Sequence, residues 1–178
     1  MKIIFLTLIA SSILFSSCEK STTPTDPIHS EPTKLVLTLT DITDATKSAS
    51  FTWSDAGSGA APSIDTIKVT PGKTYRGSVT LFDSKKTDIT STIKNKADEH
   101  QFFFTPTNGV AIRMTVGIND KDSMGLPVGL DITVSVLTGA PASGALSVVL
   151  GHYDDIKKDG KTLSPESDID IAFPVKIQ

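Results

Sequence analysis

Two clusters of side chains in this chain have the chemistry to bind a cation, and the first combines carboxylates with imidazole. Asp98, Glu99 and His100 are followed by Gln101 and three phenylalanines, at the start of a predicted strand. His152 ends another predicted strand and completes a ligand set if the two strands lie side by side. Glu99, His100 and His152 are therefore candidate ligands of a transition metal. A structural role competes, because an imidazole beside core phenylalanines is usually a hydrogen-bonded interior residue.

The second cluster, NDKDSMGLPVGLD at 119–131, has the spacing of a calcium loop. Asp120, Asp122, Gly125 and Asp131 fall on positions 1, 3, 6 and 12 of such a loop. Met124 occupies position 5, where an oxygen ligand is usual, and aspartate is shorter than the usual final glutamate. An ion-free turn between strands explains the same residues. We expect no obligatory cofactor, with calcium at the three aspartates as the alternative.

Catalytic motifs are absent from the sequence. It has no G-x-S-x-G elbow, no H-E-x-x-H, no phosphate-binding glycine loop and no second cysteine for a disulfide or a thiolate metal site. Serines and the three histidines supply the ingredients of a triad by chance alone. We therefore expect a protein that is not an enzyme.

The first 17 residues predict a secretory signal peptide. Lys2 precedes an apolar run that ends in Ser16 and Ser17, and the run is too short to span a membrane. The only cysteine, Cys18, follows at once, as in the lipobox of bacterial lipoproteins, although Phe15 stands where leucine is usual. We predict that Cys18 is lipidated, the alternative being an ordinary signal peptide followed by a free thiol.

Residues 18–33 predict a flexible tether between the lipid and the domain. The segment is rich in threonine and proline and has one aliphatic residue, Ile28, so it cannot bury enough apolar surface to fold. In the whole chain, 17 basic and 20 acidic residues give a net charge of −3 with both signs scattered. Nucleic acid is not an expected partner, because it selects a clustered basic face.

Residues 34–178 predict one domain of the all-β class. Nine runs rich in Val, Ile, Thr and Phe mostly alternate apolar with polar or small residues, and turn-forming residues separate them. They are 35–40, 50–53, 64–70, 75–82, 100–105, 110–118, 129–137, 145–153 and 168–177. This spacing favours an antiparallel β-sandwich, immunoglobulin-like or transthyretin-like. One short helix is expected within 89–100, and Trp53 is expected in the core. The charged stretch 153–168 is interpreted as a solvated loop.

Three stretches of the domain carry a resemblance to a known group of proteins. DEHQFFF at 98–104, INDKDSMGLPVGL at 118–130, and LSVVLGHYDDIKKDG with DIDIAFPV near the end resemble a family of small, uncharacterised Bacteroidetes lipoproteins of the outer membrane. The resemblance covers 34–178 and implies no catalytic residues. It implies proximity to TonB-dependent transporters, and Glu19 after Cys18 resembles the surface-export signal of such lipoproteins.

These features together predict a lipid-anchored, non-catalytic binding module of the outer membrane, facing either the periplasm or the outside. We expect it to be accessory to a TonB-dependent transporter, with the loops 55–62, 119–128 and 153–167 as the contact surface. The alternative is a structural or adhesive surface lipoprotein without a small ligand.

Overall fold

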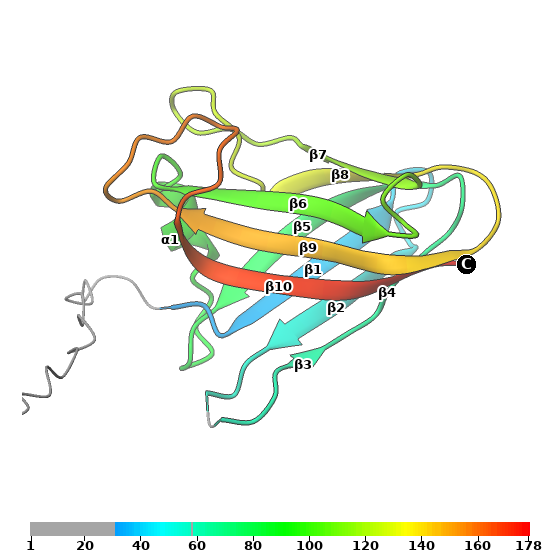
Figure 1. The fold of residues 1–178 in the computed structure, drawn as a ribbon, viewed down its shortest axis with the longest axis horizontal. Helices are drawn as coiled ribbons and strands as arrows, with labels where there is room; N and C mark the ends of the chain where they lie inside the picture. The colour runs from blue at the N-terminus through cyan, green and yellow to red at the C-terminus, as the bar shows by residue number, and fades with distance from the viewer. Residues whose placement is uncertain (1–30, 58) are drawn as a thin grey trace, which may run out of the picture.

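Two β-sheets packed face to face make up the domain (Figure 1). The computed structural model describes residues 31–57 and 59–178, so the predicted signal peptide, Cys18 and most of the predicted tether lie outside the described residues. The predicted all-β sandwich is confirmed. No helix in the described part of the chain has the length and apolarity needed to cross a bilayer.

The larger sheet has six strands in the order β3-β2-β1-β5-β8-β7. Its strands are β1 (Lys34–Asp41), β2 (Ser48–Ser54), β3 (Ser63–Ile64), β5 (Thr74–Phe82), β7 (Met114–Ile118) and β8 (Asp131–Val136). The smaller sheet has the order β4-β10-β9-β6. Its strands are β4 (Ile67–Val69), β6 (His100–Asn108), β9 (Ala142–His152) and β10 (Glu166–Ile177). The helix α1 (Thr90–Asn95) lies between β5 and β6, within the predicted range.

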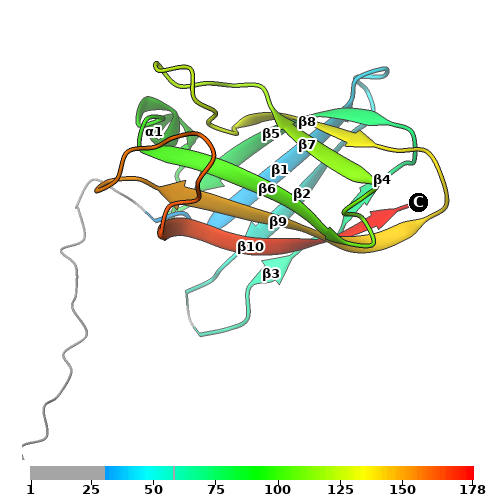
Figure 2. The same ribbon diagram turned by 45° about the horizontal axis from the view of Figure 1, so that its top comes forward.

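The core lies between the sheets and follows the alternation of the sequence. Every second residue of β1 is buried, and Leu35 and Leu37 are fully so. The facing sheet contributes Phe102, Leu150 and Phe173. Trp53 belongs to this core, as predicted. Figure 2 shows the two layers again, with β6, β9 and β10 crossing over the strands of the larger sheet.

Two of the predicted strands differ in the structure. The run 64–70 divides into β3, which pairs with β2, and β4, which pairs with β10 in the other sheet. Asp65 marks the crossing, since its carboxylate accepts a hydrogen bond from Thr52 N–H while its own N–H donates to the Thr52 carbonyl. The β4–β10 pairing is parallel, whereas the sequence predicted antiparallel strands. The run 110–118 is a strand only from Met114, because a turn occupies its first residues.

Candidate functional site

The two histidines of the predicted domain meet at one end of the smaller sheet. β6 begins at His100, β9 ends at His152, and the register pairs these two residues directly. Their imidazole rings stack with centroids 4.6 Å apart and an interplanar angle of 15°. The His100 side chain is fully buried, whereas that of His152 is 13% exposed. The predicted neighbourhood of the two imidazoles is therefore present in the structure.

A carboxylate that the sequence did not single out, Asp168, lies against both rings. One of its oxygens is 3.3 Å from His100 Nε2, and the other is 3.4 Å from His152 Nδ1. The register between β10 and β9 shifts between Ser167 and Ile169, so Asp168 sits at a β-bulge. A bulge re-aims side chains. Consequently Asp168 faces the histidines although the next residue, Ile169, is buried in the core.

Each imidazole has a second polar partner on its other nitrogen. His100 Nδ1 lies 2.9 Å from the Lys96 carbonyl oxygen. A carbonyl oxygen can only accept, so Nδ1 donates and carries a proton. His152 Nε2 lies 2.8 Å from Asp154 Oδ1. The nitrogens that face Asp168 are therefore Nε2 of His100 and Nδ1 of His152.

Glu99 belongs to a neighbouring group rather than to the same one. The structure places ligand atoms of His100, His152 and Asp168 within 4.8 Å of one another, and separately those of Glu99, His152 and Asp154. The Glu99 carboxylate is also 3.3 Å from Lys96 Nζ. The predicted trio of Glu99, His100 and His152 is thus split between two groups that share His152.

The three calcium candidates have separate protein partners in the structure. Asp120 accepts hydrogen bonds from the N–H groups of Gly129 and Leu130, at 2.9 and 3.0 Å. The Asp131 carboxylate forms an ion pair with Arg76 and accepts a hydrogen bond from the side-chain amide of Asn119. The Arg76 hydrogen bond, followed by that from Asn119, holds the pKa of Asp131 below its usual range.

Asp122, the third candidate, is enclosed. Its Oδ1 accepts from the N–H groups of Met124 and Leu126, and its Oδ2 is 3.0 Å from Lys158 Nζ. Burial raises the pKa of this carboxyl, but the Leu126 N–H and the Lys158 ammonium outweigh burial and lower it overall. Among the described residues, the structure does not gather Asp120, Asp122 and Asp131 into one ligand group, because backbone N–H groups and two cations occupy their oxygens.

A structural role for Asp120 predicts a stability loss that calcium does not affect. Asp120→Ala leaves two N–H groups of the chain around Gly129 without their acceptor, so we expect the free energy of unfolding to fall by about 1–3 kcal/mol. Urea unfolding followed by Trp53 fluorescence measures it, with the exposed neighbour Lys121→Ala as the control. A loss seen only in the presence of calcium would show that the carboxylate serves an ion instead.

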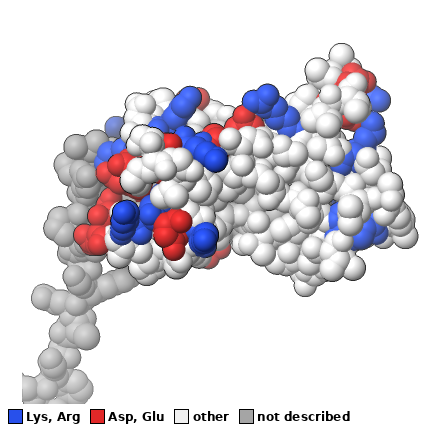
Figure 3. Space-filling view, turned by 90° about the horizontal axis from the view of Figure 1, so that it is seen from above, with Lys and Arg blue, Asp and Glu red and all other residues white. Residues whose placement is uncertain are grey.

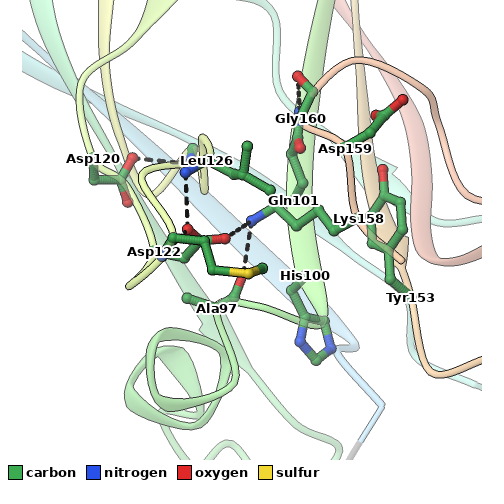
Figure 4. Close-up of polar contacts among 12 residues, drawn as sticks. Ala97, His100, Gln101, Asp120, Asp122, Leu126, Tyr153, Lys158, Asp159 and Gly160 are labelled. Carbon is green, nitrogen blue, oxygen red and sulfur yellow. Dashed lines mark hydrogen bonds and ion pairs between the residues drawn. The ribbon is translucent and has the colours of Figure 1, made fainter. Parts of the chain in front are cut away.

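The ion pair of Asp122 and Lys158 joins two loops that are far apart in the sequence (Figure 4). We call residues 119–130 and 153–165 together the double loop. The Lys158 side chain is fully buried, and its Nζ also donates to the Ala97 carbonyl at 2.7 Å. Gln101 Nε2 donates to the Gly160 carbonyl at 3.2 Å. The expectation that 153–168 is simply a solvated loop is therefore wrong at Lys158, which is one of its anchors.

Further contacts order the second half of the double loop. The Tyr153 hydroxyl donates to the Thr162 carbonyl at 2.6 Å. The Asp159 carboxylate accepts from the N–H groups of Thr162 and Lys161 and from the Thr162 hydroxyl. The Thr162 N–H, then the Lys161 N–H, lower the pKa of Asp159 to about 2. These bonds give the loop a defined shape on the end of the sandwich.

The surface of the double loop mixes apolar and charged side chains. Met124, Ile156 and Leu163 are large hydrophobic residues that remain exposed there. Met124 and Leu126 line a surface hollow of about 460 Å³ together with residues 157–159. Figure 3 shows charged side chains of both signs at this end and a mostly uncharged stretch over the middle of the molecule.

The third predicted contact loop, 55–62, lines a different hollow from the one that the double loop lines. Its first residues, Asp55 to Gly57, line a separate hollow of about 620 Å³ with Lys34, Phe82 and Lys86. Of the three predicted loops, the structure therefore joins 119–128 to 153–167, and it places the described part of the third beside the start of β1.

Comparisons with known proteins give one structural similarity. No protein-family model matches the chain, and no curated protein matches it. Among solved structures, the chain matches the crystal structure of the S-layer protein SbsC domains 4 and 5, with 13% sequence identity and a TM-score of 0.33. The match covers 72% of this chain and 63% of that chain, so this chain spans less than two thirds of the other's length.

Proposed function

We propose that the protein is a lipid-anchored, non-catalytic binding module of the outer membrane, and that the double loop contacts a TonB-dependent transporter. The observation that carries the proposal is the double loop itself. A buried ion pair holds its two halves together on the side that faces the domain, and apolar side chains are exposed on its solvent side.

Rigidity supports a binding role for this surface. Lys158 and Asp122 hold the two loops together below the surface, and Gln101 ties the second loop to β6. A loop that is already ordered loses little conformational entropy when a partner binds. The exposed side chains of Met124, Ile156 and Leu163 supply apolar contacts that bury area against a partner, and the charges around them give orientation.

The position of the chain start supports a partner at the membrane. The first described residues and the double loop lie at the same end of the sandwich in both ribbon views (Figures 1 and 2). A flexible tether that leaves from this end keeps the double loop within reach of the bilayer, although it does not fix the orientation of the domain. The loop is then placed where a membrane-embedded partner presents its own loops.

Crosslinking in cells tests the proposal. We expect the native protein to crosslink to an outer-membrane transporter, and Met124→Asp with Ile156→Asp to reduce the yield at least about tenfold, because two charges enter an apolar contact. Ile112→Asp is the matched control, since Ile112 is 83% exposed on the turn after β6. The strand β6 ends at the opposite end of the sandwich from the double loop (Figure 1).

Two outcomes speak against the transporter role. Recovery of only fimbrial or host surface proteins would support the structural or adhesive alternative. An equal loss of crosslinking in Ile112→Asp would show that the double loop is not the contact surface.

A further inference from the structure

We infer that His100, His152 and Asp168 form a binding site for one divalent transition-metal ion, for which zinc is the probe. The inference is independent of the transporter contact, because it concerns side chains at the end of the smaller sheet and not the exposed surface of the double loop. Its ligand set differs from the set that the sequence suggested, with Asp168 in place of Glu99.

The spacing of the donor atoms is close to that of the ligands of a tetrahedral ion. Zinc binds imidazole nitrogen at about 2.0–2.1 Å, and two ligands of a tetrahedral ion at this distance are about 3.3–3.4 Å apart. The Asp168 oxygens lie 3.3 Å from His100 Nε2 and 3.4 Å from His152 Nδ1. These are two different oxygens, and the donor atoms of the three residues lie within 4.8 Å of one another. Because the two rings are stacked nearly parallel, they must tilt towards each other for both nitrogens to bind one ion.

The hydrogen-bond partners of the two rings leave one nitrogen of each for an ion. His100 Nδ1 donates its proton to the Lys96 carbonyl, and the Asp154 carboxylate at 2.8 Å favours a proton on His152 Nε2. With protons on His100 Nδ1 and His152 Nε2 only, His100 Nε2 and His152 Nδ1 direct their lone pairs towards the Asp168 carboxylate. A cation between the three groups stabilises that arrangement.

The outer partners are those that metal-binding histidines require. A histidine ligand usually donates its second N–H to a backbone carbonyl or a carboxylate, which fixes its tautomer and ring orientation. His100 has the first kind of partner, the Lys96 carbonyl, and His152 has the second, Asp154. Strand pairing and the β-bulge at Asp168 hold the three ligands on rigid elements.

The donor types select the class of metal. Two imidazoles and one carboxylate suit zinc, copper(II) or another borderline ion, whereas calcium and magnesium prefer sites built from oxygen alone. His100 is fully buried, while His152 and Asp168 are 13% and 20% exposed, so the ion enters from the Asp168 side. Three protein ligands leave one position of a tetrahedral ion for water or another molecule.

Calorimetric titration of the full chain in detergent with zinc tests the site. We expect one zinc ion per chain with micromolar or tighter affinity. Asp168→Asn and His152→Ala each remove a ligand, so we expect the affinity to fall at least about tenfold. Asp170→Asn is the matched control, because Asp170 is an exposed carboxylate on the same strand. It should bind zinc as the native chain does.

A folding check keeps the result decisive. Trp53 fluorescence reports whether each variant is folded, and Asp168→Asn decides alone if His152→Ala unfolds, since asparagine keeps the shape of this partly exposed aspartate side chain. The inference is overturned by native protein that takes up no zinc at about 100 µM, far above the affinity expected of a preformed three-ligand site. It is also overturned if the native chain and Asp168→Asn have equal affinity. Met124→Asp, which tests the transporter contact, should keep its zinc affinity, so the two proposals fail separately.

Discussion

Lys158→Met is expected to lower the stability of the domain by about 3–5 kcal/mol, because it leaves a buried carboxylate without its cation. The Lys158 side chain is fully buried, and that of Asp122 is 1% exposed. Methionine fills much of the same volume, so the loss reports the charge rather than a cavity. The Ala97 carbonyl loses its ammonium donor in the same substitution.

Urea unfolding followed by Trp53 fluorescence measures this loss, and hydrogen exchange of residues 153–165 shows whether the double loop opens first. Lys157→Met is the control, since Lys157 is the exposed neighbour. The double variant Lys158→Met with Asp122→Asn removes the unpaired charge, so it should be more stable than Lys158→Met alone. A loss below about 1 kcal/mol, the range of an exposed pair, would mean that water reaches the Asp122 carboxylate.

The dependence on pH gives this prediction a second signature. In the native chain the pKa of Asp122 is lowered. The stability that this carboxylate contributes is therefore fully present above its unfolded-state pKa of 3.8, and it is lost as the pH falls from 3.8 through the lower folded-state pKa. In Lys158→Met the same carboxyl has lost its cation while burial still opposes its ionisation, so its pKa is higher than in the native chain. The deficit of the variant should therefore shrink on acidification, because protonation removes the buried charge.

Alternation and turn residues were sufficient to predict the sandwich. The pattern of β1, in which every second residue is buried, is visible in LVLTLT, and the strand ends were placed within a few residues. The division of 64–70 between two sheets could not be predicted in this way. Ile64, Ile67 and Val69 are apolar whichever sheet receives them, and the parallel partner of β4 is the last strand of the chain.

The candidate metal site was predicted in part. His100 and His152 were expected to meet, because one begins a strand and the other ends one. Asp168 was missed because DIDI reads as plain alternation, which places Asp168 on the outer face with Asp170. The bulge that turns it inwards comes from the register of β10 against β9, and nothing in the local sequence distinguishes it.

The calcium prediction depended on spacing alone and missed the distant partners of the aspartates. Arg76 and Lys158 lie far from residues 120–131 in the sequence, yet both reach carboxylates there. Lys158 also stands in a stretch whose composition is typical of a solvated loop. Its burial follows from tertiary packing against the loop at 119–130, which local composition does not encode.

Cys18→Ala is expected to move the protein from the membrane fraction to the soluble fraction almost completely. Stable anchoring takes two hydrophobic signals, and acyl chains on the sulfur and the new amino terminus of a lipoprotein supply both. Each buried CH₂ contributes about 0.8 kcal/mol, so losing whole acyl chains changes membrane partition by many orders of magnitude. Ultracentrifugation of cell lysates with immunoblotting measures it, and Ser21→Ala, in the predicted tether, is the control.

The domain itself should remain folded in Cys18→Ala, because the core is built from residues of the two sheets and begins at Leu35. The emission of Trp53 should therefore match that of the native chain. Membrane retention of a folded Cys18→Ala protein would contradict the lipid anchor and, with it, the proposal that a tether keeps the double loop within reach of the bilayer. Release combined with loss of the transporter crosslink would mean that the anchor raises the local concentration of the double loop at its partner. Release with the crosslink intact would mean that the contact of the double loop is strong enough by itself.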